Sequence, residues 1–444
     1  MTNLDAPDQR QHALGRLLFA ESATAALGRQ VLVIIVVLLG LAQLRAPVGL
    51  LLPEYVQRKD VLQEYVMARA IREGVDPYLP TDVLAERYVE GPSGTRLEHP
   101  TPHPPTVAML FLPLSLLGFE AAAALWLLLE LVCLVAAVAL LARATGARLS
   151  VAATVGVAAA LLNWYPLWVE MALGQLTVPL LAIVAAAWLA LRRSRWLLSG
   201  ALVGFGLLVK PVLAPLLLLF VIRGRRRALA SALLVVGGGY LAAGWVLGFA
   251  TLGRYFTVVL PQVSHLYRAS WRNISAPAVA WKALDGTSHG LDGLTSLPAL
   301  LYAPRLAAGA AAVLPLVLAL LGLWSVVATH SVDAALAVLV GVSVLVGPVS
   351  WPHYLVLLLV PAAVLTRWLV VNGFPARATN WALGIGILLS ADWARVALTA
   401  IAAVLQRDEV AQVPLPLVAL PWLATVAASA LTCVVVTVTV DRES

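Results

Sequence analysis

Asp60 is the residue of this 444-residue chain whose type and surroundings are best suited to chemistry. It precedes a stretch in which Val61, Leu62, Tyr65 and Val66 recur at helical spacing, a pattern that predicts a partly amphipathic helix on the membrane surface. The residues alone leave two interpretations of its carboxylate open. Aspartate is a preferred residue at a helix N-terminus, where its side chain caps backbone N–H groups. The functional alternative is that a carboxylate at the boundary of water and lipid acts as a general base on a substrate hydroxyl.

Two basic residues, Lys210 and His353, fall inside apolar segments, where ionisable groups are costly and mark functional sites. Neither has an obvious partner nearby in the sequence. A lone lysine in such a place favours contact with an anionic group, such as a lipid-linked phosphate. The alternative is that the Lys210 side chain extends to the membrane interface, where its ammonium group is hydrated.

Metal and nucleotide chemistry have little support in the sequence. His99 and His103 are four residues apart, but the prolines between them prevent a helix and no third ligand is placed, so we expect no metal site. No glycine-rich phosphate loop, paired-carboxylate DxD motif or nucleophile elbow occurs. We therefore expect neither a domain that binds a soluble nucleotide sugar nor a cofactor.

The composition determines the kind of element that carries these residues. Apolar residues make up 61% of the chain and charged residues 12%, about half the charged share of an average globular protein. So few charges cannot cover a water-soluble surface of this size, which excludes a soluble enzyme and a disordered chain. The net charge is +7, from 30 Lys and Arg minus 23 Asp and Glu. The composition predicts an all-α polytopic membrane protein with about 10–13 transmembrane helices, each of roughly 20 mostly apolar residues.

The order of apolar and polar stretches predicts how the chain is organised. The first apolar segment, 31–52, is longer than a signal-peptide core and no cleavage site follows it, which predicts an uncleaved first span and a cytoplasmic N-terminus. We expect a cytoplasmic segment over 1–30, a single membrane domain over 31–440 with outer loop 1 at 53–104 and a second polar outer region at about 254–302, and a C-terminal tail over 441–444.

Two basic runs, 192–195 and 223–227, are the strongest topology signals, and both are expected on the cytoplasmic side. The 27 residues between them must then cross the membrane an even number of times. Lys210-Pro211 interrupts them, and proline ends a helix at the preceding residue. The sequence therefore predicts a hairpin of short helices with Lys210 near its far tip.

Several short motifs follow one another in an order typical of one enzyme family. Together they cover about residues 55–360 and resemble the polyprenyl-phosphate-dependent GT-C glycosyltransferases, specifically the bacterial α-mannosyltransferases of glycosyltransferase family 87. The sequence departs from that pattern at Tyr354, where the family has a second histidine, and at Ile274, where glutamine is usual. The motifs are Asp60-Val61-Leu62-Gln63-Glu64-Tyr65 with Pro77 and Tyr78, Pro104-Pro105 before Leu110-Phe111-Leu112-Pro113, Gly174-Gln175-Leu176-Thr177, Lys210-Pro211, Asn273-Ile274-Ser275, and Ser350-Trp351-Pro352-His353-Tyr354.

The resemblance implies a GT-C-type bundle, located in the bacterial plasma membrane with its active site on the outer side. It implies that a hexosyl group, with mannose expected, moves with inversion from a polyprenyl-phosphate donor to a hydroxyl of a glycolipid or polysaccharide. Asp60 is then the general base. The leaving phosphate needs cationic donors, for which the candidates are His353, Lys210 and Arg272. The remaining candidates for binding the donor phosphate or the substrate are Tyr65, Gln175, Asn273 and Trp351.

The partners implied are the lipid-linked donor as co-substrate, the acceptor and membrane lipid, with no nucleic acid and no metal. A polytopic transporter, or a flippase of lipids or lipid-linked sugars, is the main alternative, because it fits the hydrophobicity and the intramembrane charges equally well. Against it stand the absence of internal repeats and an outer loop of about 50 residues rich in carboxylates. A non-catalytic assembly protein is a third possibility, for which no feature of the sequence speaks.

Overall fold

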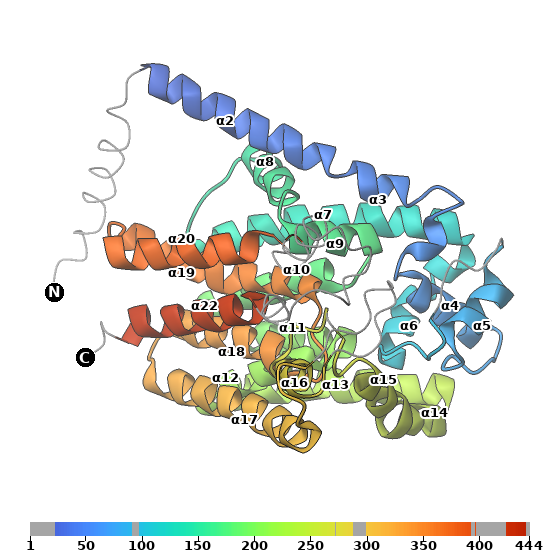
Figure 1. The fold of residues 1–444 in the computed structure, drawn as a ribbon. Helices are drawn as coiled ribbons and strands as arrows, with labels where there is room; N and C mark the ends of the chain where they lie inside the picture. Colours follow the sequence, from blue (N-terminus) through green and yellow to red (C-terminus); the bar gives the residue numbers. More distant parts are fainter. Residues whose placement is uncertain are drawn as a thin grey trace.

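A computed structural model describes residues 23–90, 97–270, 272–286, 299–391, 396 and 423–440. All regular secondary structure in these residues is helical, which confirms the all-α class. Most of the helices run side by side in one bundle (Figure 1). Residues 1–22 of the predicted N-terminal segment and the predicted tail over 441–444 lie outside the described residues.

Five helical units in the described residues are long and apolar enough to cross a membrane, which confirms a polytopic membrane protein. The first, Leu27–Gly49, overlaps the span predicted over 31–52 and combines α2 (Ala23–Ala42) with α3 (Arg45–Gly49). A sixth results if α8 (Val151–Leu161) and α9 (Tyr165–Leu173), bent by 91° relative to each other, form one span. The other four are α7 (Phe119–Thr145), α13 (Arg226–Leu247), α17 (Pro304–Ala328), and Pro352–Val371, which joins η5 (Pro352–Leu358) to α19 (Leu359–Val371).

The bundle also contains shorter helices, and one of them is enclosed in its interior. In α18 (Val332–Val346) every residue from Ala334 to Leu345 is buried, so other helices rather than lipid enclose it. The total of 10–13 spans therefore depends on how these short helices are counted, and it stays a prediction. The other short helices are α10 (Thr177–Arg192), α11 (Trp196–Val209), η3 (Pro211–Leu216) with α12 (Leu217–Ile222), α20 (Ala376–Ser390) and α22 (Leu423–Val440).

The helix predicted after Asp60 exists as α4 (Leu62–Arg72), but its surroundings differ from the prediction. Every residue from Leu62 to Ala68 is buried, including the polar Gln63 and Glu64. The helix packs against α5 (Thr81–Tyr88), α6 (Pro105–Phe111) and α7. The interpretation of α4 as a helix on the membrane surface is therefore wrong, because protein covers both of its faces along the first two turns.

The predicted hairpin around Lys210 is confirmed. α11 ends at Val209, Lys210 has an extended backbone (φ −142°, ψ 115°), and η3 begins at Pro211. Gly200 and Gly204 let α11 pack tightly against α13, since a Cβ atom at either position would overlap the backbone of Ala228 or Ala232.

The two basic runs lie at the same end of the bundle, as predicted. Arg192 donates to the carboxylate of Asp333, and Arg223 donates to the carbonyl of Thr329, both around the start of α18. Arg225 of the second run lies 4.2 Å from the ring centroid of Trp196, directly after the first run. Lys210, at the far end of α11, is therefore remote from both basic runs.

The two polar stretches pack against each other at one end of the molecule. α4, α5 and α6 lie at the same end as α14 (Phe249–Arg254) and α15 (Leu260–Leu266) (Figure 1). Arg254 forms a salt bridge with Asp76, and the rings of Tyr78 and Tyr255 stack with centroids 5.6 Å apart. The remaining helices are η1 (Val56–Arg58), η2 (Leu114–Leu116), the π-helix η4 (Tyr255–Val259) and α16 (Ala276–Leu284).

Candidate active site

Asp60 is held in place by its two neighbours in the chain. The buried ammonium of Lys59 donates to the carbonyl of Ala172 at 2.7 Å, and the backbone N–H of Val61 donates to the carbonyl of Leu173 at 3.3 Å. Both contacts fasten the segment after η1 to the end of α9. The chain then turns at Gly174, whose φ of +71° is favourable only for glycine.

The Asp60 carboxylate does not cap α4. The N-cap of that helix is Val61, with no side-chain hydrogen bond to the first turn. Instead, Asp60 Oδ2 accepts a hydrogen bond of 2.6 Å from Gln175 Nε2. The capping interpretation is therefore wrong, and the carboxylate is available to other partners.

The surroundings of Asp60 make its carboxyl group a weaker acid than usual. Asp60 is half-buried, and burial raises its pKa to about 6. The negative charge of Glu64 acts in the same direction, whereas the Gln175 hydrogen bond and the charges of His103 and Lys210 oppose the rise. A carboxyl group with this pKa is ionised at neutral pH and still binds a proton readily, as a general base must.

Lys210 provides a buried positive charge next to this carboxylate. Its side chain is 3% exposed, and within the described residues its ammonium has no hydrogen-bond partner. Its Nζ lies 4.2 Å from the ring centroid of Tyr354, and its charge acts on both Asp60 and His353. A buried ammonium without hydrogen-bonded partners is costly, and here its charge acts on the carboxylates of Asp60 and Glu170.

His353 lies beside Lys210 at the start of η5. It is 3% exposed, its Nε2 atom has no hydrogen-bond partner in the described part of the chain, and its ring contacts that of Tyr354 at 5.0 Å between centroids. The half-buried Trp351 packs edge-on against Tyr267 at 5.1 Å, and the Tyr267 hydroxyl is 2.6 Å from His99 Nε2. These aromatic rings form one wall next to the charged groups.

The sequence matches the model of one known protein family. The model of glycosyltransferase family 87 matches residues 102–349, more than half of the chain. The chain belongs to glycosyltransferase family 87. Neither the curated proteins nor the solved structures contain a match. Family membership makes the chain a membrane glycosyltransferase and decides against the transporter or flippase.

The matched residues of this family 87 enzyme include Gln175 and Lys210 but neither Asp60 nor His353. The tertiary structure brings these four residues together from segments far apart in the sequence. Asp60 precedes α4, Gln175 follows the turn at Gly174, Lys210 is the tip of the hairpin, and His353 begins η5.

The family 87 enzyme also has a buried carboxylate–histidine pair near Asp60 that the sequence did not reveal. Glu64 Oε1 and His103 Nδ1 are hydrogen-bonded, both side chains are buried, and the His103 charge acts on Asp60. The position of Glu64, four residues after Asp60, is the one signal available in the sequence. His99 and His103, which the sequence made unlikely metal ligands, each have a partner in the protein. The described residues contain no group of three or more His, Cys, Asp or Glu side chains suited to a metal.

Two of the predicted binding residues, Asn273 and Tyr65, use their polar atoms in hydrogen bonds within the protein. The Asn273 side chain donates to the carbonyls of Tyr267 (3.1 Å) and Pro348 (3.0 Å), and its Oδ1 accepts from the backbone N–H groups of Ser275 (3.1 Å) and Ser350 (2.9 Å). These four bonds occupy the whole amide, so Asn273 joins two loops rather than binding a ligand.

Tyr65 is likewise a packing residue. It is 2% exposed, and its hydroxyl donates to the carbonyl of Leu117 at 2.7 Å. Its ring packs against that of Phe119 at 5.1 Å between centroids. Arg272 is half-buried in the loop next to Asn273.

Proposed function

We propose that this enzyme transfers a mannosyl group from a polyprenyl-phosphate donor to a hydroxyl of a glycolipid or polysaccharide acceptor, with inversion. The observation that carries the proposal is the juxtaposition of Asp60, a carboxylate held by Gln175, with Lys210, a buried ammonium whose charge acts on it. A base with a cation nearby is what such a transfer requires. Mannose itself rests on the resemblance of the sequence motifs.

In the proposed reaction, Asp60 removes the proton from the acceptor hydroxyl as its oxygen attacks the anomeric carbon. The bond between that carbon and the donor phosphate oxygen breaks on the opposite face of the sugar. The electron pair of the broken bond stays with the departing lipid phosphate, and the proton stays on Asp60. The pKa of about 6 supports this role, because Asp60 is then ionised before the reaction at neutral pH.

Lys210 and His353 are the proposed binding groups for the leaving phosphate. The phosphate gains negative charge in the transition state, and fixed positive charges or hydrogen-bond donors aimed at it lower the barrier. The ammonium of Lys210 and the Nε2 atom of His353 lack hydrogen-bond partners among the described residues. A phosphate oxygen would supply what each lacks, and we propose that no metal is required.

The position of the site in the bundle supports an active site on the outer side of the bacterial plasma membrane. Basic runs mark the cytoplasmic side of membrane proteins, and here they lie at one end of α11 while Lys210 lies at the other. The 14 residues of α11 span about 21 Å at 1.5 Å per residue. This separation supports a site toward the opposite face of the membrane.

The test is sugar transfer in membranes that contain the wild type or Asp60→Asn, with radiolabelled polyprenyl-phosphate-mannose and a lipid extract of the source organism. We expect transfer by the wild type and a loss of at least about 100-fold in the variant, within the range for removal of a general base. Glu86→Gln, an exposed carboxylate of α5, is the matched control and should keep full activity. Equal activity of Asp60→Asn and wild type would contradict the proposal.

A further inference from the structure

The side chain of Glu170, in α9, is fully enclosed by protein and only one of its two oxygens is bonded. The residue is 0% exposed. Its Oε1 atom accepts hydrogen bonds from the backbone N–H groups of Thr177 and Val178, the first two residues of α10. Its Oε2 atom has no hydrogen-bond partner among the described residues. A buried carboxylate is costly unless a positive charge balances it, so the two N–H groups account for only part of its surroundings.

The bonded half of Glu170 holds the turn between α9 and α10. A carboxylate at the start of a helix pairs with N–H groups that have no partner within the helix. The backbone carbonyl of Glu170 accepts from the N–H groups of Gly174 at 2.9 Å and Gln175 at 3.1 Å. From α7, the indole of Trp126 donates to the carbonyl of Gly174 at 2.9 Å. Glu170 therefore fixes both ends of the turn that brings the Gln175 amide to Asp60.

The positive charge that acts on Glu170 is the ammonium of Lys210. The same charge acts on Asp60, and the ammonium has no hydrogen-bond partner in the described part of the chain. α9 and α10 both pack against η5, the element that carries His353 next to Lys210. The ammonium thus acts on two carboxylates, the half-buried Asp60 and the fully buried Glu170.

A second buried carboxylate nearby, Glu130 of α7, has a different lysine as its partner. The charges of Glu130 and Lys59 act on each other, and the Lys59 ammonium is bonded to the carbonyl of Ala172. The chain therefore carries two acid–lysine combinations behind the site. The first fastens the segment before α4, and the second, Glu170 with Lys210, includes the cation of the proposed reaction.

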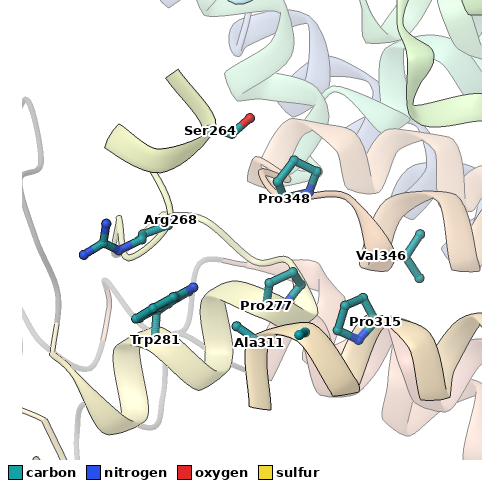
Figure 2. A pocket seen from close by; sticks show the side chains of 9 residues that line it. Ser264, Arg268, Pro277, Trp281, Ala311, Pro315, Val346 and Pro348 are labelled. Atoms are coloured by element: carbon teal, nitrogen blue, oxygen red, sulfur yellow. The ribbon is translucent and has the colours of Figure 1, made fainter. Parts of the chain in front are cut away.

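Glu170 acts through its neighbours and not by contact with a substrate. Its side chain is closed off from solvent. The cavity of about 380 Å³ between α15, α16, α17 and the turn before η5 includes neither Glu170 nor Lys210 in its lining (Figure 2). Any effect of Glu170 on the reaction must therefore pass through the turn that carries Gln175 or through the charge of Lys210.

We propose that Glu170 is a positioning residue that serves the base and the cation of the site together. Through the turn, it holds Gln175 against Asp60. Through its charge, it competes with the lipid phosphate for the ammonium of Lys210, and this part rests on the proposed function. An ammonium without that competing carboxylate would hold the departing phosphate more tightly. Glu170 thereby weakens the binding of the lipid phosphate product and favours its release.

Binding of polyprenyl phosphate to the purified enzyme in detergent tests the charge without any transfer of sugar. Glu170→Gln keeps an oxygen for the N–H groups of Thr177 and Val178 and removes the charge. We expect its Kd for polyprenyl phosphate to be about three- to thirtyfold lower than that of the wild type, within the range for coupled groups. Glu120→Gln, an exposed carboxylate of α7, is the matched control and should keep the wild-type Kd. An unchanged or higher Kd in Glu170→Gln would overturn the proposal.

A double substitution assigns this effect to Lys210. In Lys210→Met no ammonium remains for which Glu170 could compete, so adding Glu170→Gln should leave the Kd unchanged. The same tightening with and without Lys210 would contradict the proposal. If the variants bind as expected and the wild type transfers no sugar, the failure belongs to the proposed reaction. If the wild type binds no polyprenyl phosphate, the competition at Lys210 is refuted together with the proposed phosphate site.

The turn is tested by comparing Glu170→Ala with Glu170→Gln, since the charge is absent from both. Only the alanine variant lacks an acceptor for the N–H groups of α10, so its melting temperature should be lower. Its acid limb of transfer should lie at higher pH, by up to roughly 0.4–1 pH unit, because Gln175 is no longer held against Asp60. Thermal unfolding and the pH series of transfer rates measure both. Equal melting temperatures and equal acid limbs would show that the turn forms without Glu170.

Discussion

Gln175 donates a hydrogen bond of 2.6 Å from its Nε2 atom to Asp60 Oδ2, although the two residues are 115 positions apart in the sequence. The bond exists because Lys59 and Val61 fasten the segment before α4 to the end of α9, which immediately precedes the turn to Gln175. The base of the proposed reaction is therefore positioned by the packing of α9 and not by the helix that follows it.

The pH dependence of transfer follows from the pKa of Asp60. The group must be ionised to accept a proton, and burial raises its pKa to about 6. We expect kcat/KM to be constant above that pH and to fall tenfold per pH unit well below it. The measurement is initial transfer rate from pH 4.5 to 8.5 at subsaturating donor. An acid limb near pH 4, the ordinary range of an aspartate, would contradict the assignment.

Gln175→Leu should move this acid limb to higher pH. The amide hydrogen bond lowers the pKa of Asp60, so its loss raises that pKa further. A net hydrogen-bond energy of about 0.5–1.5 kcal/mol corresponds to roughly 0.4–1 pH unit. The same pH series measures the shift, and Gln262→Leu, an exposed residue of α15, serves as control. A uniform loss of rate with an unmoved limb would show that Gln175 acts only on structure.

Lys210→Met should reduce kcat by about 10²–10³-fold, the usual effect of removing one donor to a developing oxyanion. The melting temperature should change little, because two effects oppose each other: the substitution removes a buried ammonium without a hydrogen-bond partner in the described residues, and it removes a charge that acts on the carboxylates of Asp60 and Glu170. Transfer assays and thermal unfolding in detergent measure the two effects, with exposed Arg193→Met as control. A variant that loses stability and keeps its kcat would mean that Lys210 is a structural residue.

Tyr354 should contribute through its ring and not through its hydroxyl. The Lys210 ammonium lies 4.2 Å from the ring centroid, and such a contact is worth about 0.5–2 kcal/mol. We expect Tyr354→Phe to keep kcat/KM close to the wild type and Tyr354→Leu to lose about 2- to 30-fold. Steady-state transfer kinetics of the two variants distinguish these results. A large loss in Tyr354→Phe would instead assign a role to the hydroxyl.

Asn273→Ala should act on stability rather than on donor binding. The side chain makes four hydrogen bonds between the Tyr267 loop and the turn at Pro348 and Ser350, and the substitution leaves buried backbone groups unpaired. We expect a loss of about 2–4 kcal/mol in unfolding free energy, seen as a lower melting temperature in detergent. The protein that remains folded should keep its KM for a short-chain donor. Normal stability with a raised KM would restore Asn273 as a binding residue.

The chain composition and its local patterns determined the class of the protein. Sixty-one per cent apolar residues exclude a soluble fold, and the basic runs on either side of Lys210-Pro211 determine a hairpin with the lysine at its tip. These features depend on hydrophobicity, on the missing N–H of proline and on charge, each of which acts within a few residues along the chain. They are therefore readable without any knowledge of the partners that a helix meets.

Only the tertiary structure decided what the individual polar residues contact. The sequence left Asp60 between a helix cap and a base, treated α4 as a surface helix, and gave no means of pairing Glu64 with His103. Asn273 lies in one of the motifs that carry the family resemblance, but its side-chain amide is hydrogen-bonded to two loops. Such contacts join segments 39 to 115 residues apart, and they depend on how helices of similar apolar character pack, which local periodicity does not encode.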